Sequence, residues 1–284
     1  MSESRPTVRQ RRLAATLVRL RELAGRTPDE AADRIGCHRT KISRIENARL
    51  GISLGELRDL LTFYGVDDEA HAEDLVSLAR RKRDAGWAQR VAMALPSYAD
   101  YIDYEETADY VRSFQPLLIA GLLQTPDYAR AVFRGSNAML SHERVDELVD
   151  IRIQRQAVLN KANPPRVCVI EGEAALLAQV GGAKVMRAQL AHLADLAERP
   201  NVELQVIPHS MGAHAGLMGA FVLFSFPTSA FSDVICVEHK TGTLYMETPE
   251  ETDTYTLTFD SLRSAALSPL ESLGLIAQVK TMVD

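Results

Sequence analysis

Apolar positions at the start of the chain follow the period of a helix. Between residues 9 and 24 an apolar residue recurs every three or four positions, the spacing that gives a helix one buried face. Gly25 predicts the end of this helix. Thr27, Pro28 and Glu30 then supply an N-cap, a proline at the first helical position and the glutamate of a capping box. The pattern therefore predicts two helices joined by a tight turn.

The helical pattern continues through a short unit. A third helix is predicted over residues 38–47, with Ile42 and Ile45 facing inward. Ser53 is suited to cap a fourth helix, in which leucines repeat at helical spacing. Residues 1–66 are therefore expected to form an all-α domain.

The pattern changes further along the chain. Residues 67–95 form an amphipathic stretch that we interpret as a connecting helix and hinge, and residues 98–161 again follow helical spacing. Short segments rich in Val, Ile and Phe then predict strands at residues 166–170, 202–207, 220–226 and 234–238. Helices are predicted at residues 184–197 and 255–267, and from Ser268 onward. The expected fold class is α+β, with residues 96–284 forming a mixed helical and β-sheet domain.

Charge separates the two parts of the chain. The whole chain has 32 basic and 38 acidic side chains, a net charge of -6, which as one number argues against a nucleic-acid partner. Residues 1–62, however, hold 13 basic against 8 acidic side chains, a balance of +5 that leaves -11 for the remainder. Only the amino-terminal part is therefore expected to approach phosphates.

Cysteine usage and hydropathy bear on the compartment. The chain has 3 cysteines, an odd number without a Cys-x-x-Cys pair, which favours a reducing environment. Its longest apolar stretch, residues 215–224, is far shorter than the roughly 18–20 residues of a membrane-spanning helix. The arginine-rich start does not resemble a secretory signal. We expect a cytoplasmic protein that does not bind membranes.

Three runs of residues stand out in the amino-terminal part: Leu20-Arg21-Glu22-Leu23-Ala24-Gly25, Glu30-Ala31-Ala32-Asp33-Arg34-Ile35-Gly36 and Ile42-Ser43-Arg44-Ile45-Glu46-Asn47. These runs resemble the Cro-like (XRE) helix-turn-helix family. Ala31 and Ala32 are small where two helices must cross, and Gly36 permits the turn. The resemblance implies a helix-turn-helix domain that binds double-stranded DNA with its third helix in the major groove.

The resemblance also assigns individual contacts. Arg39, Thr40 and Arg44 match the positions that read base edges, where an arginine–guanine pair contributes roughly 1–3 kcal/mol of discrimination. Phosphate contacts are expected from His38, Lys41, Ser43, Arg11 and Arg12. Arg21 and Glu46 match a structural ion pair between the first and third helices.

The rest of the chain resembles the domain attached to such motifs in actinobacterial WhiJ-like regulators, which are described as antitoxin-like. The resemblance is carried by residues 114–125 with Tyr128-Ala129-Arg130, by Arg155-Gln156, and by Gly212-Ala213-His214-Ala215-Gly216, among other segments. It implies a transcriptional regulator whose second domain binds a short partner protein encoded nearby. A small-molecule ligand in that domain is the alternative.

We recognise no catalytic or metal-binding motif in the sequence of the second domain. Residues 121–125 lack the Gly-Lys-Ser/Thr ending of a phosphate loop and are expected to form a turn or helix start. His209 and His214 do not have the spacing of a zinc protease motif. No catalytic residue, metal or cofactor is therefore expected, and an enzyme is the weakest of the three hypotheses. Candidates for a ligand or partner pocket are Trp87, Gln124 and His214.

A homodimer is expected on geometric grounds. One short recognition helix reads few base pairs, and two copies on paired half-sites gain affinity and specificity together. Residues 98–161 and the last helix are both candidate interfaces, and the sequence does not choose between them.

Overall fold

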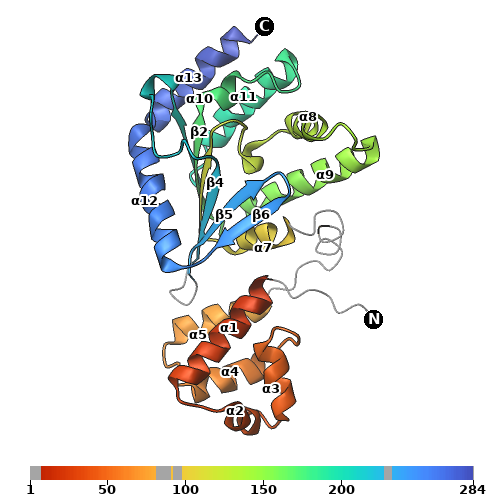
Figure 1. Ribbon diagram of the computed structural model, residues 1–284, viewed down its shortest axis with the longest axis vertical. Coiled ribbons are helices and arrows are strands. Elements are labelled where there is room, and N and C mark those ends of the chain that lie inside the picture. The colour runs from red at the N-terminus through yellow and green to blue at the C-terminus, as the bar shows by residue number, and fades with distance from the viewer. Residues whose placement is uncertain (1–7, 81–90, 92–97, 227–231, 284) are drawn as a thin grey trace. The chain divides into compact units, whose positions relative to one another are not determined.

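The computed structural model describes residues 8–80, 91, 98–226 and 232–283 (Figure 1). The chain forms two compact units, residues 1–104 with 227–231, and residues 105–226 with 232–284. Among the described helices, none combines the length and the apolar character that are needed to cross a membrane.

Short helices around one apolar core make up the first unit. They are α1 (Val8–Leu23), α2 (Pro28–Arg34), α3 (Arg39–Glu46), α4 (Leu54–Phe63) and α5 (Glu69–Arg80). The predicted capping box of Thr27 and Glu30 starts α2, and Ser53 caps α4 with Glu56 completing a second box. Leu17, Ile42 and Leu57 lie in the shared core.

Helix α5 belongs to this core and extends the helical unit beyond residue 66. Its Leu75 and Val76 are fully buried in the same cluster as Leu17 and Leu57. The expected hinge over residues 67–95 therefore begins with a helix packed against its own unit. Trp87 and the other residues at 81–90 and 92–97 lie outside the described part of the chain.

A mixed six-stranded sheet organises the second unit. Its strands are β1 (Tyr110–Gln115), β2 (Arg166–Gly172), β3 (Val202–Ile207), β4 (Phe221–Ser225), β5 (Val234–His239) and β6 (Gly242–Met246). They lie in the order β3-β2-β1-β4-β5-β6. Strands β1, β2 and β3 are parallel, and each of the others is antiparallel to its preceding neighbour in that order. The parallel strands consequently have their carboxyl ends at one edge of the sheet.

Helices cover both faces of the sheet. They are α8 (Pro126–Ser136), α9 (His142–Arg155), α10 (Glu173–Leu177), α11 (Ala183–Ala197), α12 (Pro249–Ala265) and α13 (Pro269–Met282). Helix α7 (Ala99–Thr107) precedes β1, and its residues 99–104 belong to the first unit. Short 3-10 helices lie at Gly121–Leu123, Gln156–Asn160 and His209–Met211. Figure 1 shows α12 along one face and α9 and α11 on the other side. Phe259 and Leu262 of α12 pack with Ile170 and Leu223 of the sheet. The expected α+β class is confirmed.

Strand β1 corrects the prediction that helical spacing dominates residues 98–161. Arg112 and Ser113 interrupt its apolar pattern, yet both are buried. Arg112 Nη2 donates to Ser225 Oγ at 2.6 Å and to Asp233 Oδ2 at 3.0 Å. Because these partners lie more than a hundred residues away, the local pattern gave no sign that an arginine could occupy a central strand.

Two further elements differ from expectation, one strand that was missed and one helix that begins earlier. Strand β6, a short half-buried edge strand, was not predicted. Helix α12 begins at Pro249 rather than near Tyr255, because Thr248 and Glu251 form a capping box ahead of the apolar repeat. The four predicted strands and the cap of α13 at Ser268 are confirmed.

An ion pair with both side chains 1% exposed joins α7 to α9. Arg155 donates to the two carboxylate oxygens of Glu105, from Nε at 2.9 Å and from Nη2 at 2.6 Å. This fork satisfies both carboxylate oxygens in a site without water access. The pair thereby joins Glu105, near the carboxyl end of α7, to the last residue of α9.

We expect Arg155→Met to lower the free energy of unfolding by about 3–5 kcal/mol, because Glu105 would keep a buried charge without its partner. Urea denaturation followed by circular dichroism measures the change. Arg130→Met, at a more exposed pair with Asp127 and Asp146, should cost less than about 1 kcal/mol. Equal losses in the two variants would contradict the role assigned to burial.

Glu171 is completely buried at the carboxyl end of β2. Its Oε1 accepts a hydrogen bond from Ala120 N at 2.8 Å, whereas Oε2 has no partner among the described atoms. Burial raises the pKa of this carboxyl from 4.5 to about 8. The side chain is therefore protonated in the folded protein at neutral pH.

Because the unfolded chain releases this proton at a lower pH, the folded protein should lose stability as pH rises from about 5 to 8. The glutamine of Glu171→Gln does not titrate. The free energy of unfolding of the wild type should therefore fall, relative to that of this variant, by up to about 1.4 kcal/mol per pH unit. Urea titrations at several pH values give the difference. Parallel stability curves for the two proteins would refute a buried, protonated Glu171.

Candidate nucleic-acid interface

Helices α2 and α3 form the helix-turn-helix of the first unit. Ala31 and Ala32 are buried to 0% and 3% exposure, so the small side chains let α2 pack closely into the core. Gly36 turns the chain with φ of 64°, a conformation that a side chain disfavours. Ile42 and Ile45 anchor α3 from the inside, at 1% and 3% exposure. The packing thus fixes which face of α3 is left outside.

The outer face of α3 is polar and carries the residues expected to contact DNA. Arg39, Thr40, Ser43 and Arg44 are all exposed. They occupy the positions that Ile42 and Ile45 leave open, and the structure brings them together on one side of the helix. We call this group of four side chains the α3 face.

His38 precedes the helix and shapes its first turn. Its Nδ1 accepts hydrogen bonds from the backbone N of Thr40 at 3.2 Å and from the Thr40 hydroxyl at 2.8 Å. The backbone donor requires an unprotonated Nδ1, so the ring proton lies on Nε2. His38 is exposed, and Nε2 is therefore available as a donor, while Thr40 offers the lone pairs of its hydroxyl.

The two arginines of the α3 face differ in their surroundings. Arg39 Nη1 lies 3.3 Å from Asp29 Oδ2 of α2, and both side chains are about two-thirds exposed. Such a pair contributes little stability and exchanges readily. Arg44 has no ion-pair partner within the described ranges. Asp29, which sequence reasoning missed, therefore orients Arg39 without holding it firmly.

The structure gives Lys41 a partner within the protein. Its Nζ forms an ion pair with Glu56 of α4, the same residue that completes the capping box with Ser53. The hydrogen bond from Lys41 lowers the pKa of Glu56. Lys41 thus joins α3 to α4, which limits its freedom to contact a phosphate.

Arg11 and Arg12 lie on α1, away from α3 in the sequence and engaged elsewhere. Arg11 Nη2 lies 2.8 Å from Asp100 Oδ2, and the Arg12 guanidinium lies 5.1 Å from the centre of the Tyr104 ring. All four residues belong to the first unit. These contacts do not bring Arg11 and Arg12 onto the α3 face.

Arg21 and Glu46 join α1 to the end of α3. Arg21 donates from Nε to Glu46 Oε1 at 2.6 Å and from Nη2 to Oε2 at 3.2 Å. Their side chains are only 10% and 11% exposed. The hydrogen bond to Glu46 raises the pKa of the Arg21 guanidinium. Arg21 therefore stays ionised, and its pair with Glu46 fixes the carboxyl end of α3.

The pocket residues expected in the second unit have local structural roles. Gln124 Nε2 donates to the Ile119 carbonyl at 2.7 Å, and its Oε1 accepts from Arg152. His214 Nδ1 accepts from Gly216 N at 3.1 Å and so stabilises its own loop. Trp87 lies outside the described residues.

A network of buried polar side chains holds the segment that follows β1, and sequence reasoning missed most of it. Tyr128 Oη accepts from Ile119 N, and Glu171 accepts from Ala120 N. Gln189 binds both Leu123 O and Thr125 N, at 2.7 Å each. Glutamine side chains on distant helices give no periodic signal, so only the structure reveals these contacts.

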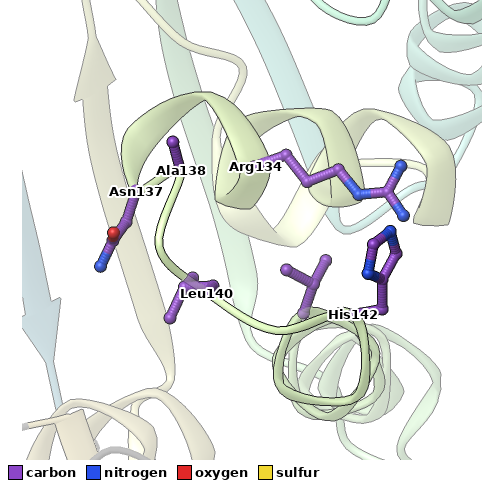
Figure 2. Close-up of a pocket in the computed structure, with 6 residues that line it drawn as sticks. Arg134, Asn137, Ala138, Leu140 and His142 are labelled. Carbon is purple, nitrogen blue, oxygen red and sulfur yellow. The ribbon is translucent and has the colours of Figure 1, made fainter.

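A cavity of about 300 Å³ lies between α8 and α9. Its lining residues are Arg134, Asn137, Ala138, Leu140, His142 and Val145. Figure 2 shows Arg134 and His142 pointing toward each other. None of the residues expected from the sequence lines this cavity. Clusters of three metal-ligating side chains are absent from the described parts of the chain.

Comparison with known families divides the chain in the same way. A family model described as "Domain of unknown function (DUF5753)" matches residues 98–278, and a "Helix-turn-helix domain" model matches residues 12–73. The chain has no match among curated proteins and none among solved structures. The second match covers the α3 face and supports a DNA-binding regulator.

We expect Glu46→Gln to lower the free energy of unfolding of the first unit by roughly 2–4 kcal/mol, because the largely buried Arg21 charge would keep only the distant, exposed carboxylate of Glu22 at 3.9 Å. Arg21→Met in the same background should then cost less than it does alone, a coupling that thermal or urea unfolding can measure. Glu73→Gln, at the exposed pair with Arg58, is the matched control. Additive effects of Arg21→Met and Glu46→Gln would contradict the pairing.

Proposed function

The chain belongs to the family of the domain of unknown function DUF5753, here joined to a helix-turn-helix domain, and from this premise we propose a sequence-specific DNA-binding transcriptional regulator. The observation that carries the proposal is the α3 face, an exposed polar surface on a helix whose opposite side is fixed in the core. A rigid helix with an exposed arginine near each end is suited to enter a major groove.

The roles of the side chains follow from their surroundings. Arg44 and Arg39 donate to guanine O6 and N7, and Arg39 exchanges its weak pair with Asp29 for the base. Thr40 accepts a hydrogen bond from a base amino group. His38, through Nε2, and Ser43 contact phosphates. The resemblance to the XRE family supports this assignment, and the +5 balance of residues 1–62 supports approach by this unit alone.

The second unit is proposed to regulate DNA affinity. The resemblance to WhiJ-like regulators supports a short partner protein as the signal, in a cytoplasmic, actinobacterial setting. Binding of such a partner would be coupled to DNA binding through a difference in affinity between two states. Co-purification of the full chain from its native cells, followed by mass spectrometry, tests this part of the proposal: a stoichiometric short protein supports it, and the chain recovered alone contradicts it.

A small-molecule ligand is the second candidate signal, and the cavity between α8 and α9 favours it. Arg134 and His142 line this cavity and suit an anionic compound. Mass spectrometry of the same purified material under non-denaturing conditions distinguishes the two signals, since a bound metabolite adds far less mass than a protein. The proposal does not include an enzyme activity.

Arg39→Ala and Arg44→Ala should each reduce discrimination between a preferred and a scrambled DNA sequence by roughly 1–3 kcal/mol, because each removes a base-reading guanidinium. The preferred sequence is first selected by the wild type from a randomised library. Fluorescence anisotropy at one salt concentration then gives affinity for both sequences.

Arg58→Ala on α4 is the matched control and should leave discrimination unchanged, since Arg58 pairs with Glu73 outside the α3 face. Arg11→Ala and Arg12→Ala should weaken both sequences alike if they contact phosphates. Equal weakening of both sequences by Arg39→Ala and Arg44→Ala would overturn the base-reading assignment.

A further inference from the structure

Three loops at the carboxyl ends of β1, β2 and β3 carry large apolar side chains on their surface. The loop after β1 exposes Leu117 and Leu118, and α10, directly after β2, ends in the exposed Leu177. The loop between β3 and β4 exposes Met211, Leu217 and Met218. Leu217 is 67% exposed and Met218 is 98% exposed. We call these six side chains the apolar edge.

Contacts between the three loops bring them together at this end of the sheet. Gly172 lies so close to Pro116 that a Cβ there would approach the Pro116 carbonyl oxygen to 2.6 Å. Gly216 likewise leaves no room for a Cβ beside the Phe114 ring. Glu173 Oε2 accepts a hydrogen bond from His209 N at 2.7 Å. The three loops that carry the apolar edge therefore lie side by side, although they are far apart in the sequence.

Hydrogen bonds fix the loops that expose these side chains. The backbone N–H groups that follow Leu117 and Leu118 donate hydrogen bonds to Tyr128 and Glu171, and both of these side chains are completely buried. His214 holds the loop that presents Leu217 and Met218 through its hydrogen bond to Gly216 N. Loops fixed in this way keep their tips outward and lose little entropy when a partner covers them.

Charge distinguishes this region from the rest of the domain. Residues 98–284 contain 14 basic and 24 acidic side chains, a balance of -10. Residues 114–124, 174–183 and 208–219 contain no Lys, Arg, Asp or Glu. Two copies of so acidic a domain repel each other over most of their surfaces, whereas a basic partner would be attracted to those same surfaces. An apolar region without charge therefore favours a second copy of this chain.

We propose that the apolar edge is the contact surface of a homodimer. A two-fold contact places the same patch on both copies, so an uncharged patch meets itself without repulsion. Exposed apolar patches of this kind mark interaction sites on soluble proteins. The inference rests on the proposed function, because paired half-sites require two copies of α3, and it adds the surface that joins them.

Sedimentation equilibrium of the full chain tests the proposal. The wild type should sediment as a dimer, and Leu217→Asp with Met218→Asp should give a monomer, because each copy would bring two new carboxylates into the contact. Leu257→Asp, at a side chain 70% exposed on α12, is the matched control and should remain a dimer. An unchanged circular dichroism spectrum is expected, since the altered side chains are exposed and the fold of each copy stays the same.

Several results would overturn the proposal. They are a monomeric wild type, a double variant that remains dimeric, and a control that dissociates equally. Recovery of a different protein bound to these loops in place of a second copy would also overturn it.

DNA binding separates the failure of this inference from that of the proposed function. The double variant should still prefer the selected sequence at a single half-site but should lose cooperative binding to paired half-sites. A wild type that dimerises through the apolar edge but binds no DNA would contradict the proposed function and leave the dimer surface intact. A wild type that binds DNA specifically as a monomer would contradict the dimer surface and leave the proposed function intact.

Discussion

The buried pairing of Arg21 with Glu46 is the interaction on which the DNA-reading geometry depends. A helix of eight residues is too short to be stable alone, so its orientation must come from its surroundings. Ile42 and Ile45 fix one side of α3 in the core, and Glu46 fixes its carboxyl end to α1. The polar face of α3 is consequently exposed to solvent, and the proposed reading of DNA bases depends on that face.

The second unit uses buried polar groups for a related purpose. Glu171, Tyr128 and Gln189 satisfy the backbone of an irregular segment that would otherwise carry unpaired polar groups in the interior. A protonated carboxyl suits this role, because an ionised one would be costly at such depth. Loops held in this way present apolar side chains on segments that contain no Lys, Arg, Asp or Glu, which is the basis of the proposed dimer contact.

Local signals in the sequence predicted much of this structure. Capping residues such as Thr27 and Ser268, and apolar strands such as Val202–Ile207, act over a few residues and were read correctly. Strand β1 was missed because the hydrogen-bond partners of Arg112, Ser225 and Asp233, lie more than a hundred residues away in the sequence. The partner that Lys41 finds in Glu56 and the network around Glu171 were missed for the same reason: both depend on tertiary contacts.

Photo-crosslinking of the full chain to DNA tests directly whether the α3 face reads bases. DNA selected by the wild type would carry a photoreactive base at each position in turn, and mass spectrometry would identify the attached peptides. We expect crosslinks to base positions from residues 39–44 of α3. Crosslinks confined to residues 105–284, or none at any base position, would contradict it.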